Sequence, residues 1–346
     1  MELIRGVHNL RPEHRGSVVT IGNFDGVHTG HQMLLERLRR LADQQHQPLT
    51  VVLFEPQPRE YFGGDQAPAR LTPLRDKVRL LARCGVDRVL CLTFNQRLRE
   101  LSAQQFIQQV LVEGLGASRV VVGDDFRFGC DRKGDFALLQ QQGAHYYGFQ
   151  AEHAATFQLD DERVSSSRVR TLLASGNFQQ VACLLGRAFR YEGLVRQDRQ
   201  LGRTLGVPTA NLPLPMKPPA LQGVYVVVVA TQNGDLHWGV ANIGWRPTVG
   251  STRPVLEVHV LDFTGNLYGQ RLTVIPCQRL RGEQRFDGIE ALRAQLMRDI
   301  DAGHHYAKRM VAGTDGSFRM KALCDDDASG WPLLATAPAV TESASS

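Results

Sequence analysis

The sequence predicts an α/β region built on a doubly wound parallel sheet, followed by an antiparallel sheet or small barrel and then a single helix. Up to about Gly186, continuously apolar, valine-rich runs alternate with helical patterns, as expected of parallel strands that are covered on both faces. Beyond that point, short alternating runs are broken by Gly, Pro and Asn, a pattern typical of antiparallel strands joined by turns. At 346 residues, the chain is long enough for two domains of ordinary size.

Four strand candidates lie in the first half, separated by helices with recognisable ends. Thr72 and Pro73 predict an N-cap followed by proline at the first helical position, and Gly85 predicts the end of that helix. Ser102 and Gln105 have the spacing of a capping box that opens the next helix. This order implies right-handed crossovers, with ligands bound at the carboxyl ends of the strands. The strand candidates are 17–21, 49–54, 87–94 and 118–123.

The second half, from 189 to 278, reads as a set of strands joined by short turns. The turn residues in TQNGDL (231–236) and DFTGNL (262–267) predict hairpins between strands. An amphipathic helix follows in 286–303, and the chain then becomes small, polar and acidic, which predicts a disordered tail. The predicted domains are 1–186 and 187–313, with the tail at 314–346.

Composition and charge limit the classes of function. The longest aliphatic run, 224–230, is too short to span a bilayer, and the N-terminus lacks the apolar core of a signal peptide. The six cysteines show no CxxC spacing, which favours reduced thiols in the cytoplasm. The net charge of +5 is spread along the chain, so we expect phosphate-bearing small molecules as partners, with no nucleic acid and no membrane. The oligomeric state is left open.

The segment GNFDGVHTGH (22–31) stands between a strand candidate and a helical pattern. Its glycines let the backbone approach a ligand closely, and the helix that follows presents free N–H groups to an anion. His28 and His31 could both face a phosphate there, whereas the alternative is two histidines on an ordinary turn. The other predicted ligand-binding positions of this segment are Gly22, Asn23, Phe24, Asp25 and Gly26.

Two later segments could converge on the same ligand. In 121–134, charged residues are interleaved with aromatic ones, and Asp125 and Phe128 are the candidates; a solvated charged loop is the alternative. In VSSSRVR (164–170), arginines at a helix start oppose the helix dipole, a conflict that a bound phosphate would relieve. Plain serine caps are the alternative there. The candidates in that segment are Ser165, Ser166, Arg168 and Arg170.

The chemistry that fits these segments is in-line attack at a nucleotide phosphate. The chain contains neither GxGxxG nor GxxxxGK[ST], so neither a dinucleotide fingerprint nor a P-loop accounts for the phosphate signals. No nucleophile and base stand at local spacing either. Such an attack needs positioning and charge stabilisation rather than a covalent intermediate.

The segment GRTLGVPTANL (202–212) is the most distinctive phrase of the second half. Thr209 and Asn211 are two residues apart on an extended segment, so their side chains share one face. A hydroxyl and an amide carbonyl are hard oxygen ligands of the kind that Mg²⁺ takes, although a structural turn would use the same residues. The accompanying candidates for nucleotide binding are Gly202, Arg203, Gly206 and Pro208.

The strand VLEVHVLD (255–262) places a carboxylate opposite an apolar face. Leu256, Val258 and Val260 form the apolar face, and Glu257 and His259 share the other. If that second face covers a ligand, Glu257 is a candidate base for a substrate hydroxyl. If it faces water, both residues are merely solvated.

Taken together, these motifs resemble those of the bacterial bifunctional riboflavin kinase/FAD synthetases. The resemblance runs from about residue 5 to 310 and includes FEPQP (54–58), GVY (223–225), NIGWRPTV (242–249) and LYGQRL in addition to the segments above. It implies a Rossmann-like nucleotidylyltransferase domain that adenylylates FMN to FAD and pyrophosphate. It also implies a riboflavin kinase-like barrel that phosphorylates riboflavin with ATP and Mg²⁺.

The resemblance assigns roles to individual residues. Thr209 and Asn211 would hold Mg-ATP, Glu257 would be the base that activates the ribityl hydroxyl, and Asp125 would lie near the ligands of the first site. The residues implied to hold the nucleotide phosphates in the first site are His28, His31, Ser165, Ser166 and Arg170.

Three positions depart from the family's pattern. Gln57 stands where a histidine is usual, Ser167 replaces a threonine, and Trp245 replaces a small polar residue. Two alternatives remain: a nucleotidylyltransferase for another substrate, such as a phosphopantetheine or nicotinate mononucleotide, fused to an unrelated barrel, or a non-catalytic flavin- or nucleic-acid-binding protein. GRTLGVPTAN together with Glu257 favours the bifunctional flavin enzyme.

Overall fold

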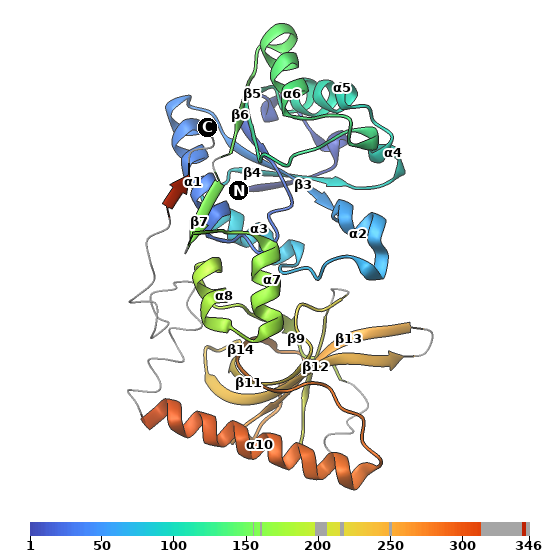
Figure 1. Ribbon diagram of the computed structural model, residues 1–346, viewed down its shortest axis with the longest axis vertical. Coiled ribbons are helices and arrows are strands. Elements are labelled where there is room, and N and C mark those ends of the chain that lie inside the picture. Colours follow the sequence, from blue (N-terminus) through green and yellow to red (C-terminus); the bar gives the residue numbers. More distant parts are fainter. Residues whose placement is uncertain are drawn as a thin grey trace. The chain divides into compact units, whose positions relative to one another are not determined.

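The computed structural model describes residues 1–154, 156–159, 161–197, 206–214, 218–248, 251–312 and 341–343 (Figure 1). The chain divides into two compact units. The first contains Met1–Pro68 and Thr72–Ser165, and the second contains Ala69–Leu71 and the chain from Ser166 to the long helix α10. The boundary predicted at Gly186 lies beyond this division, and it stays a prediction.

A six-stranded parallel sheet forms the centre of the first unit, in the order β1-β4-β3-β2-β5-β6. The four predicted strands correspond to β2 to β5. The edge strands β1 and β6 were not predicted, because both are short and largely exposed and so lack the apolar run. The strand bounds are β1 Glu2–Arg5, β2 Ser17–Ile21, β3 Leu49–Glu55, β4 Arg88–Thr93, β5 Ala117–Val122 and β6 Gln150–His153.

Helices cover both faces of this sheet, which confirms the doubly wound prediction. Val18 of β2 packs against one buried cluster with residues of α1 and α3, while Val19 packs against another with residues of α5, η4 and α6. The α-helices are α1 Thr29–Gln44, α2 Pro58–Gly63, α3 Leu74–Arg83, α4 Gln96–Arg99, α5 Ala103–Phe106 and α6 Phe136–Gln142. The 3-10 helices are η1 Val7–Asn9, η2 Pro12–His14, η3 Gly64–Gln66 and η5 Cys130–Arg132, and the π-helices are η4 Ile107–Gly114 and η6 Gly143–Tyr147.

The helix ends were predicted with mixed success. The capping box of Ser102 and Gln105 is present, with the Gln105 N–H donating to Ser102 Oγ at 3.1 Å and the Ser102 N–H donating to Gln105 Oε1 at 2.9 Å. The predicted cap at Thr72 is wrong, since α3 begins at Leu74 with Pro73 as its N-cap. Thr72 instead donates its backbone N–H to Asp25 Oδ1.

A small antiparallel sheet in the order β15-β7-β8 completes the first unit. Its strands are β7 Thr156–Leu159, β8 Glu162–Arg163 and β15 Thr341–Ser343. The rest of the predicted tail lies outside the described residues.

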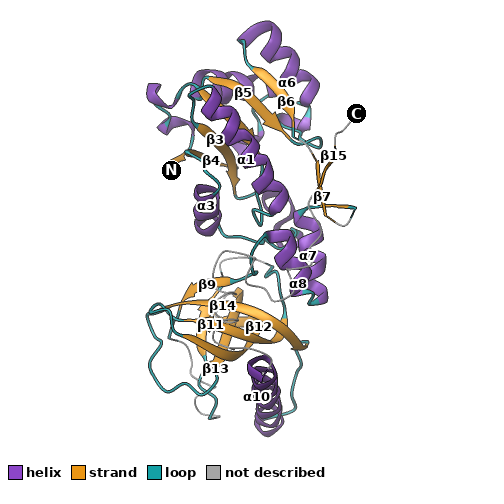
Figure 2. Ribbon diagram, turned by 90° about the vertical axis from the view of Figure 1, so that its left-hand side faces the viewer, coloured by secondary structure: helices purple, strands orange, loops and turns teal. Residues whose placement is uncertain are grey.

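The second unit is built on six antiparallel strands in the order β10-β13-β12-β11-β14-β9. The strands curve into a barrel (Figure 2). A bridge between Arg196 and Asn211 joins the two edges of the sheet. The strands are β9 Tyr191–Leu194, β10 Ala210–Pro213, β11 Gly223–Ala230, β12 Leu236–Thr248, β13 Ser251–Val260 and β14 Arg271–Arg281. The helices are α7 Ser166–Ser175, α8 Phe178–Leu185 and α10 Ile289–Ala312.

One of the two predicted hairpins is wrong. TQNGDL does join β11 to its neighbour β12, with the Gly234 N–H donating to the Thr231 carbonyl at 3.1 Å. DFTGNL joins β13 to β14, which are not neighbours, because both edges of β13 already pair with β10 and β12. Turn residues indicate where a chain reverses, and they do not indicate which strand becomes its partner.

The long helix α10 packs against the barrel through polar and aromatic contacts. Arg281 of β14 donates from Nε and Nη2 to the carboxylate of buried Asp299, at 3.1 and 2.7 Å. The rings of Trp238 and Tyr306 meet edge to face, with centroids 5.6 Å apart. The predicted amphipathic helix is therefore present and packs through one side.

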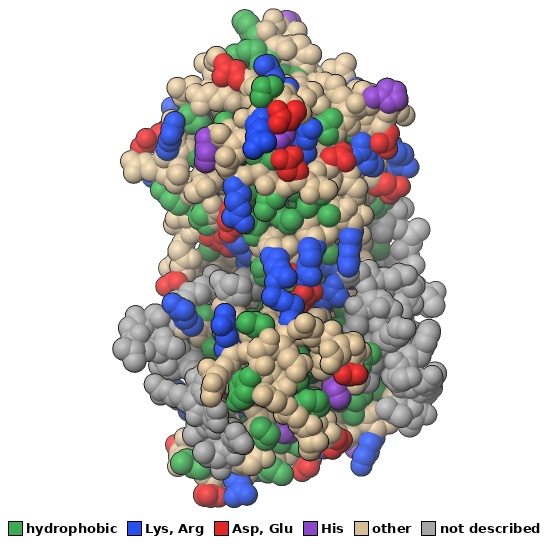
Figure 3. Space-filling view, turned by 180° about the vertical axis from the view of Figure 1, so that it is seen from behind, with side chains coloured by type: hydrophobic (Ala, Val, Ile, Leu, Met, Phe, Trp, Pro, Cys, Tyr) green, Lys and Arg blue, Asp and Glu red, His purple; other side chains and the backbone are tan. Residues whose placement is uncertain are grey.

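The surface carries charges of both signs, and the described cysteines are not joined by disulfide bonds. Figure 3 shows basic and acidic side chains intermixed over one face, and ion pairs in the first unit include Arg37 with Glu152 at 3.4 Å and Arg79 with Asp76 at 2.8 Å. The five cysteines within the described ranges form no disulfide bonds with one another. None of the described helices has the length and apolar character needed to cross a bilayer.

Candidate active sites

The loop after β2 is tightly bent and buried. Phe24 (φ 46°), Gly26 (φ 87°) and Val27 (φ 41°) all adopt left-handed backbone conformations. Such conformations are strained for Phe and Val and persist only where the surroundings hold them, and both side chains are buried in the core. The loop lies at the carboxyl end of β2, which stands between β3 and β5 in the sheet. The strand order changes direction between β2 and β5, and such a point is the usual position of the ligand in a doubly wound sheet.

His28 is the N-cap of α1, which explains the spacing of the two histidines. The His31 N–H donates to His28 Nδ1 at 3.3 Å, and the two rings stack with centroids 3.6 Å apart. Because Nδ1 accepts, the proton of the neutral His28 ring is on Nε2, which makes that atom a donor. Gly30 permits this fold-back, since a Cβ there would stand only 3.3 Å from His28 Nδ1.

His31 is held in its neutral form. Burial lowers its pKa well below the ordinary value, and electrostatic interactions with His28 and Lys77 lower it further. Its Nδ1 is buried and has no hydrogen-bond partner within the described part of the chain. A neutral imidazole with an unused polar atom at a ligand-binding edge is suited to contact an incoming group.

Lys77 and Thr72 hold the loop from the side of α3, and neither contact was predicted. Lys77 is only 1% exposed, and its Nζ donates to the Asn23 carbonyl at 2.7 Å. The Thr72 N–H donates to Oδ1 of buried Asp25 at 3.1 Å. The sequence signal that could have indicated the burial of Lys77 was the helical period, which places Lys77 on the same buried face as Leu81.

The other predicted residues of the first site lie in different surroundings. Asp125 is exposed and pairs with Arg163 at 3.2 Å. Phe128 is buried, stacks on Phe126 and packs against Phe106 in the core.

The serine and arginine segment is divided between the two units. Ser165 ends the first unit, whereas Ser166, Arg168 and Arg170 belong to α7 of the second. Within that unit, Arg170 Nε donates to the Ala69 carbonyl. The predicted helix start is present, and the meeting of these residues with His28 and His31 stays a prediction.

An exposed aromatic cluster at the carboxyl ends of β3 and β4 was also missed. Phe94 lies 5.2 Å from Tyr61 and 5.8 Å from Phe62 between ring centroids, and Arg99 stands over the Phe62 ring at 5.4 Å. Phe62 is 61% exposed, which is unusual for so large an apolar ring. Gln57 opens the adjacent helix α2 as its N-cap, with its N–H donating to Glu60 at 2.8 Å.

In the second unit, Asn211 and Glu257 are brought together by strand pairing. Asn211 of β10 and Asn242 of β12 are the direct partners of Glu257 on its two sides. Directly opposite residues of antiparallel strands have their side chains on one face, with Cβ atoms about 4.5–5.5 Å apart. Leu256, Val258 and Val260 are buried on the other face, which confirms the predicted alternation.

Asn211 offers an unsatisfied oxygen. Its side chain is buried, and Oδ1 has no hydrogen-bond partner among the residues that the structure describes. The adjoining segment is fixed to β13, because His259 Nδ1 donates to the Pro208 carbonyl at 2.8 Å. A buried amide oxygen of this kind is available to a ligand, a metal ion or an ordered water.

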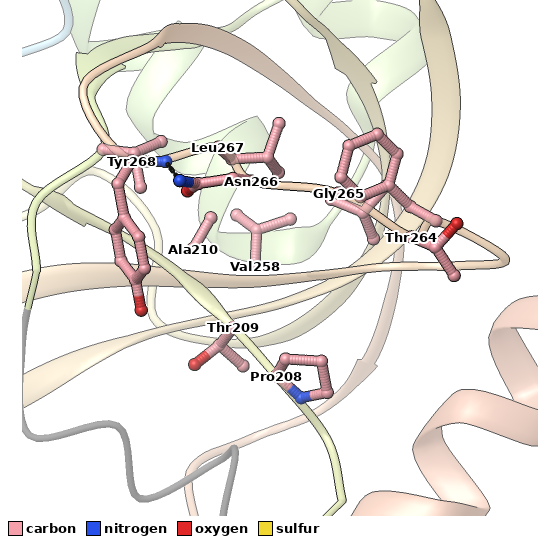
Figure 4. A pocket seen from close by; sticks show the side chains of 12 residues that line it. Pro208, Thr209, Ala210, Val258, Thr264, Gly265, Asn266, Leu267 and Tyr268 are labelled. Carbon is pink, nitrogen blue, oxygen red and sulfur yellow. Dashed lines mark hydrogen bonds between the residues drawn. The ribbon is translucent and has the colours of Figure 1, made fainter.

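A pocket of about 540 Å³ opens beside Thr209 (Figure 4). Pro208, Thr209 and Ala210 form one wall, and the 263–268 loop, including Tyr268, forms another. The segment predicted as a hairpin turn is therefore a wall of this pocket. Gly206 precedes the pocket in a left-handed turn (φ 78°), whereas Gly202 and Arg203 lie outside the described residues.

Comparison with known proteins matches the two parts of the chain to two kinds of enzyme domain. The sequence model of FAD synthetase matches residues 10–168, and that of riboflavin kinase matches residues 185–307. A Pseudomonas fluorescens protein named bifunctional riboflavin kinase/FMN adenylyltransferase is 54% identical over 308 residues, covering 89% of this chain and 98% of its own length. An Escherichia coli K12 protein of the same name is 49% identical, covering 86% and 96%.

Among solved structures, a Streptococcus pneumoniae protein described as a macrolide-efflux protein superposes with a TM-score of 0.70. It is 28% identical, and the match covers 87% of this chain and 98% of that one. Its description applies to that protein alone. The likeness shows that the two-unit architecture recurs in a solved protein.

Proposed function

The chain belongs to the bifunctional riboflavin kinase/FMN adenylyltransferase family, and we propose that its two units perform the two reactions at the two sites described above. It phosphorylates riboflavin with ATP to FMN, and it adenylylates FMN with ATP to FAD and pyrophosphate. The observation that carries the proposal is the pairing of Asn211 with Glu257, which joins an unsatisfied oxygen to a carboxylate on one strand face.

At the first site, a phosphate oxygen of FMN attacks the α-phosphorus of ATP, and pyrophosphate leaves. His28 Nε2–H and the positive end of the α1 helix dipole would stabilise the charge on the phosphates. Neutral His31 would contact the same group. The exposed ring of Phe62 and the half-buried ring of Phe94, at the same edge of the sheet, would stack on the flavin ring.

At the second site, the terminal ribityl hydroxyl attacks the γ-phosphorus of ATP. Glu257 would accept the hydroxyl proton as the new O–P bond forms and ADP leaves. The pocket beside Thr209 would hold the adenosine part of ATP. The roles of Asn211 and Glu257 follow from the strand face that they share, whereas the pocket reaches Thr209 from the opposite face, which Ala210, Val258 and Val260 line.

Thr209 and Asn211 fit a magnesium ion. The Thr209 hydroxyl and the orphaned Oδ1 of Asn211 are hard neutral oxygens, and Mg²⁺ takes such donors together with water and phosphate oxygens. Within the described residues, no group of three or more His, Cys, Asp or Glu side chains could hold a metal. This donor set suits an ion that arrives with ATP, where it neutralises charge on the transferred phosphate.

Product analysis tests the proposal. The purified protein is incubated with riboflavin, ATP and Mg²⁺, and the flavins are separated by chromatography; a second reaction starts from FMN. We expect FMN and FAD from the first reaction and FAD from the second. Adenylyl transfer to a phosphopantetheine or to nicotinate mononucleotide, without FAD, would support another nucleotidylyltransferase. No conversion at all would support a binding protein. Because the five described cysteines form no disulfide with one another, we also propose a cytoplasmic location.

A further inference from the structure

We propose that Lys77 is a positioning residue for FMN adenylylation: its ammonium group fixes the loop after β2 and thereby the stacked pair of His28 and His31. The proposal rests on the proposed function of the first site. Lys77 belongs to α3, outside the histidine-bearing segment, and its Nζ donates to the backbone carbonyl of Asn23 in that segment.

The burial of Lys77 calls for a role. Lysine is almost never fully buried, because removing an ammonium group from water costs free energy unless pairing or hydrogen bonds in the site offset that cost. Lys77 is 1% exposed, while its Nζ donates to the Asn23 carbonyl at 2.7 Å. A leucine at this position would fill the same core without that cost, so the charge itself has a use here.

A continuous path leads from the ammonium group to the histidines. Asn23 directly precedes Phe24, whose left-handed backbone begins the strained part of the loop. The Phe24 ring lies 4.8 Å from the His31 ring, and the His31 ring lies 3.6 Å from that of His28. Fixing the Asn23 carbonyl therefore fixes the turn that sets both imidazoles.

The same lysine acts on His31 electrostatically. The groups that lower the pKa of His31 electrostatically are His28 from its own helix start and Lys77 from α3, while Asp25 in the loop accepts from the Thr72 N–H. Both His28 and Lys77 lower the pKa of His31, in addition to burial. Removal of the ammonium group therefore raises the pKa of His31, so that protonation begins at a higher pH.

The test compares three variants of the full chain. Lys77→Met removes the charge and keeps the length, Lys77→Arg keeps the charge, and Arg79→Met removes an exposed cation from the same helix as a matched control. For each variant, kcat and KM of FAD formation from FMN are measured across pH. Riboflavin phosphorylation in the same sample and thermal melting report on folding.

We expect Lys77→Met to lower kcat of FAD formation by roughly 10²-fold, the cost of misplacing catalytic groups by about an ångström. The acid limb of its pH profile should move to higher pH, while riboflavin phosphorylation stays near normal. Lys77→Arg should regain part of the activity, and Arg79→Met should behave as the original chain. Unchanged kcat and an unchanged acid limb in a folded Lys77→Met protein would overturn the proposal.

A measurement without catalysis separates this proposal from the proposed function. The titration of His31 is followed by NMR in the original chain and in Lys77→Arg and Lys77→Met, with the signal assigned by its loss in His31→Gln. We expect a higher pKa in Lys77→Met, even if no FAD were formed by any sample. If Lys77→Met does not fold, Lys77→Gln, which also lacks the charge, is measured in its place, and an unchanged kcat with an unchanged His31 pKa in that folded variant would overturn the proposal.

Discussion

Asn211 on β10 and Glu257 on β13 are direct partners across two antiparallel strands, with their side chains on the same face. The pairing joins the PTAN segment to the carboxylate of LEVHV, which are far apart in the sequence. Asn242 continues the row on the other side of Glu257. We propose that this polar row, opposite a buried apolar face, is the surface that holds the substrate.

Glu257→Gln keeps the shape of the side chain but cannot accept a proton. We expect FMN formation from riboflavin to fall about 10²–10⁴-fold, the range for loss of general-base help. Binding of riboflavin and ATP should be largely retained, and FAD synthesis from supplied FMN should survive. Product analysis with each flavin in turn checks this, with exposed Glu290→Gln as the control. Near-normal FMN formation would remove the base assignment.

Asn211→Ala removes the proposed oxygen ligand. We expect the magnesium concentration needed for half-maximal kinase activity to rise by at least ~10–100-fold, the loss seen even for outer-sphere partners of a metal. Asn211→Asp keeps an oxygen in place and should lose less. A magnesium titration of riboflavin phosphorylation distinguishes these cases, and equal requirements in all three proteins would argue against metal binding there.

His28 has a capping role and a proposed catalytic role, and two variants separate them. His28→Ala loses both, so the first unit should be destabilised by about 1 kcal/mol through loss of the cap. FAD formation should also fall about 10²–10³-fold through loss of a transition-state donor. His28→Asn restores a good cap but not the imidazole, so its melting temperature should recover while FAD formation stays low. Recovery of both properties would show that the histidine is only a cap.

The lowered pKa of His31 has a consequence for stability. Because burial, His28 and Lys77 lower its folded-state pKa below 6.5, the unfolded chain binds more protons as pH falls below that value. Stability contributed by the neutral ring is therefore lost as pH drops toward the folded-state pKa. We expect calorimetric melting of the first unit to decline between about pH 7 and about pH 5. His31→Gln should flatten this decline, whereas exposed His145→Gln should not.

Asp299→Ala would leave Arg281 without its buried partner. Both side chains are largely shielded from solvent, and breaking such a pair costs about 3–5 kcal/mol. We expect a lower melting temperature of the second unit, with the first unit unchanged. Asp301→Ala, on the exposed side of the same helix, provides the comparison. Equal melting of the two variants would show that α10 is held by its apolar contacts alone.

Local patterns in the sequence predicted what depends on local physics. Valine-rich runs identified the central strands, and Ser102 with Gln105 identified a helix start. The short, exposed strands β1 and β6 were missed, because their neighbours rather than their own residues make them strands. The wrong hairpin at 262–267 has the same origin, since only long-range pairing decides which strand lies next to β13.

The candidate sites show the same limit. Alternation in LEVHV correctly placed Glu257 opposite the buried face, but no pattern could show that Asn211 would lie directly across from it. Lys77 was overlooked because a lysine within a helical pattern is usually on the solvent side. Its burial depends on the loop after β2, whose left-handed turns at Phe24 and Val27 bring the Asn23 carbonyl within reach.

The bridge between Arg196 and Asn211 makes one residue serve two purposes. The Asn211 carbonyl accepts from the Arg196 N–H at 2.9 Å, where the edge strands of the barrel meet, while its side chain faces the proposed site. A substrate complex that holds the side chain also reinforces this seam. Occupancy of the site and closure of the barrel are then thermodynamically linked, so binding of the substrate stabilises the fold that binds it.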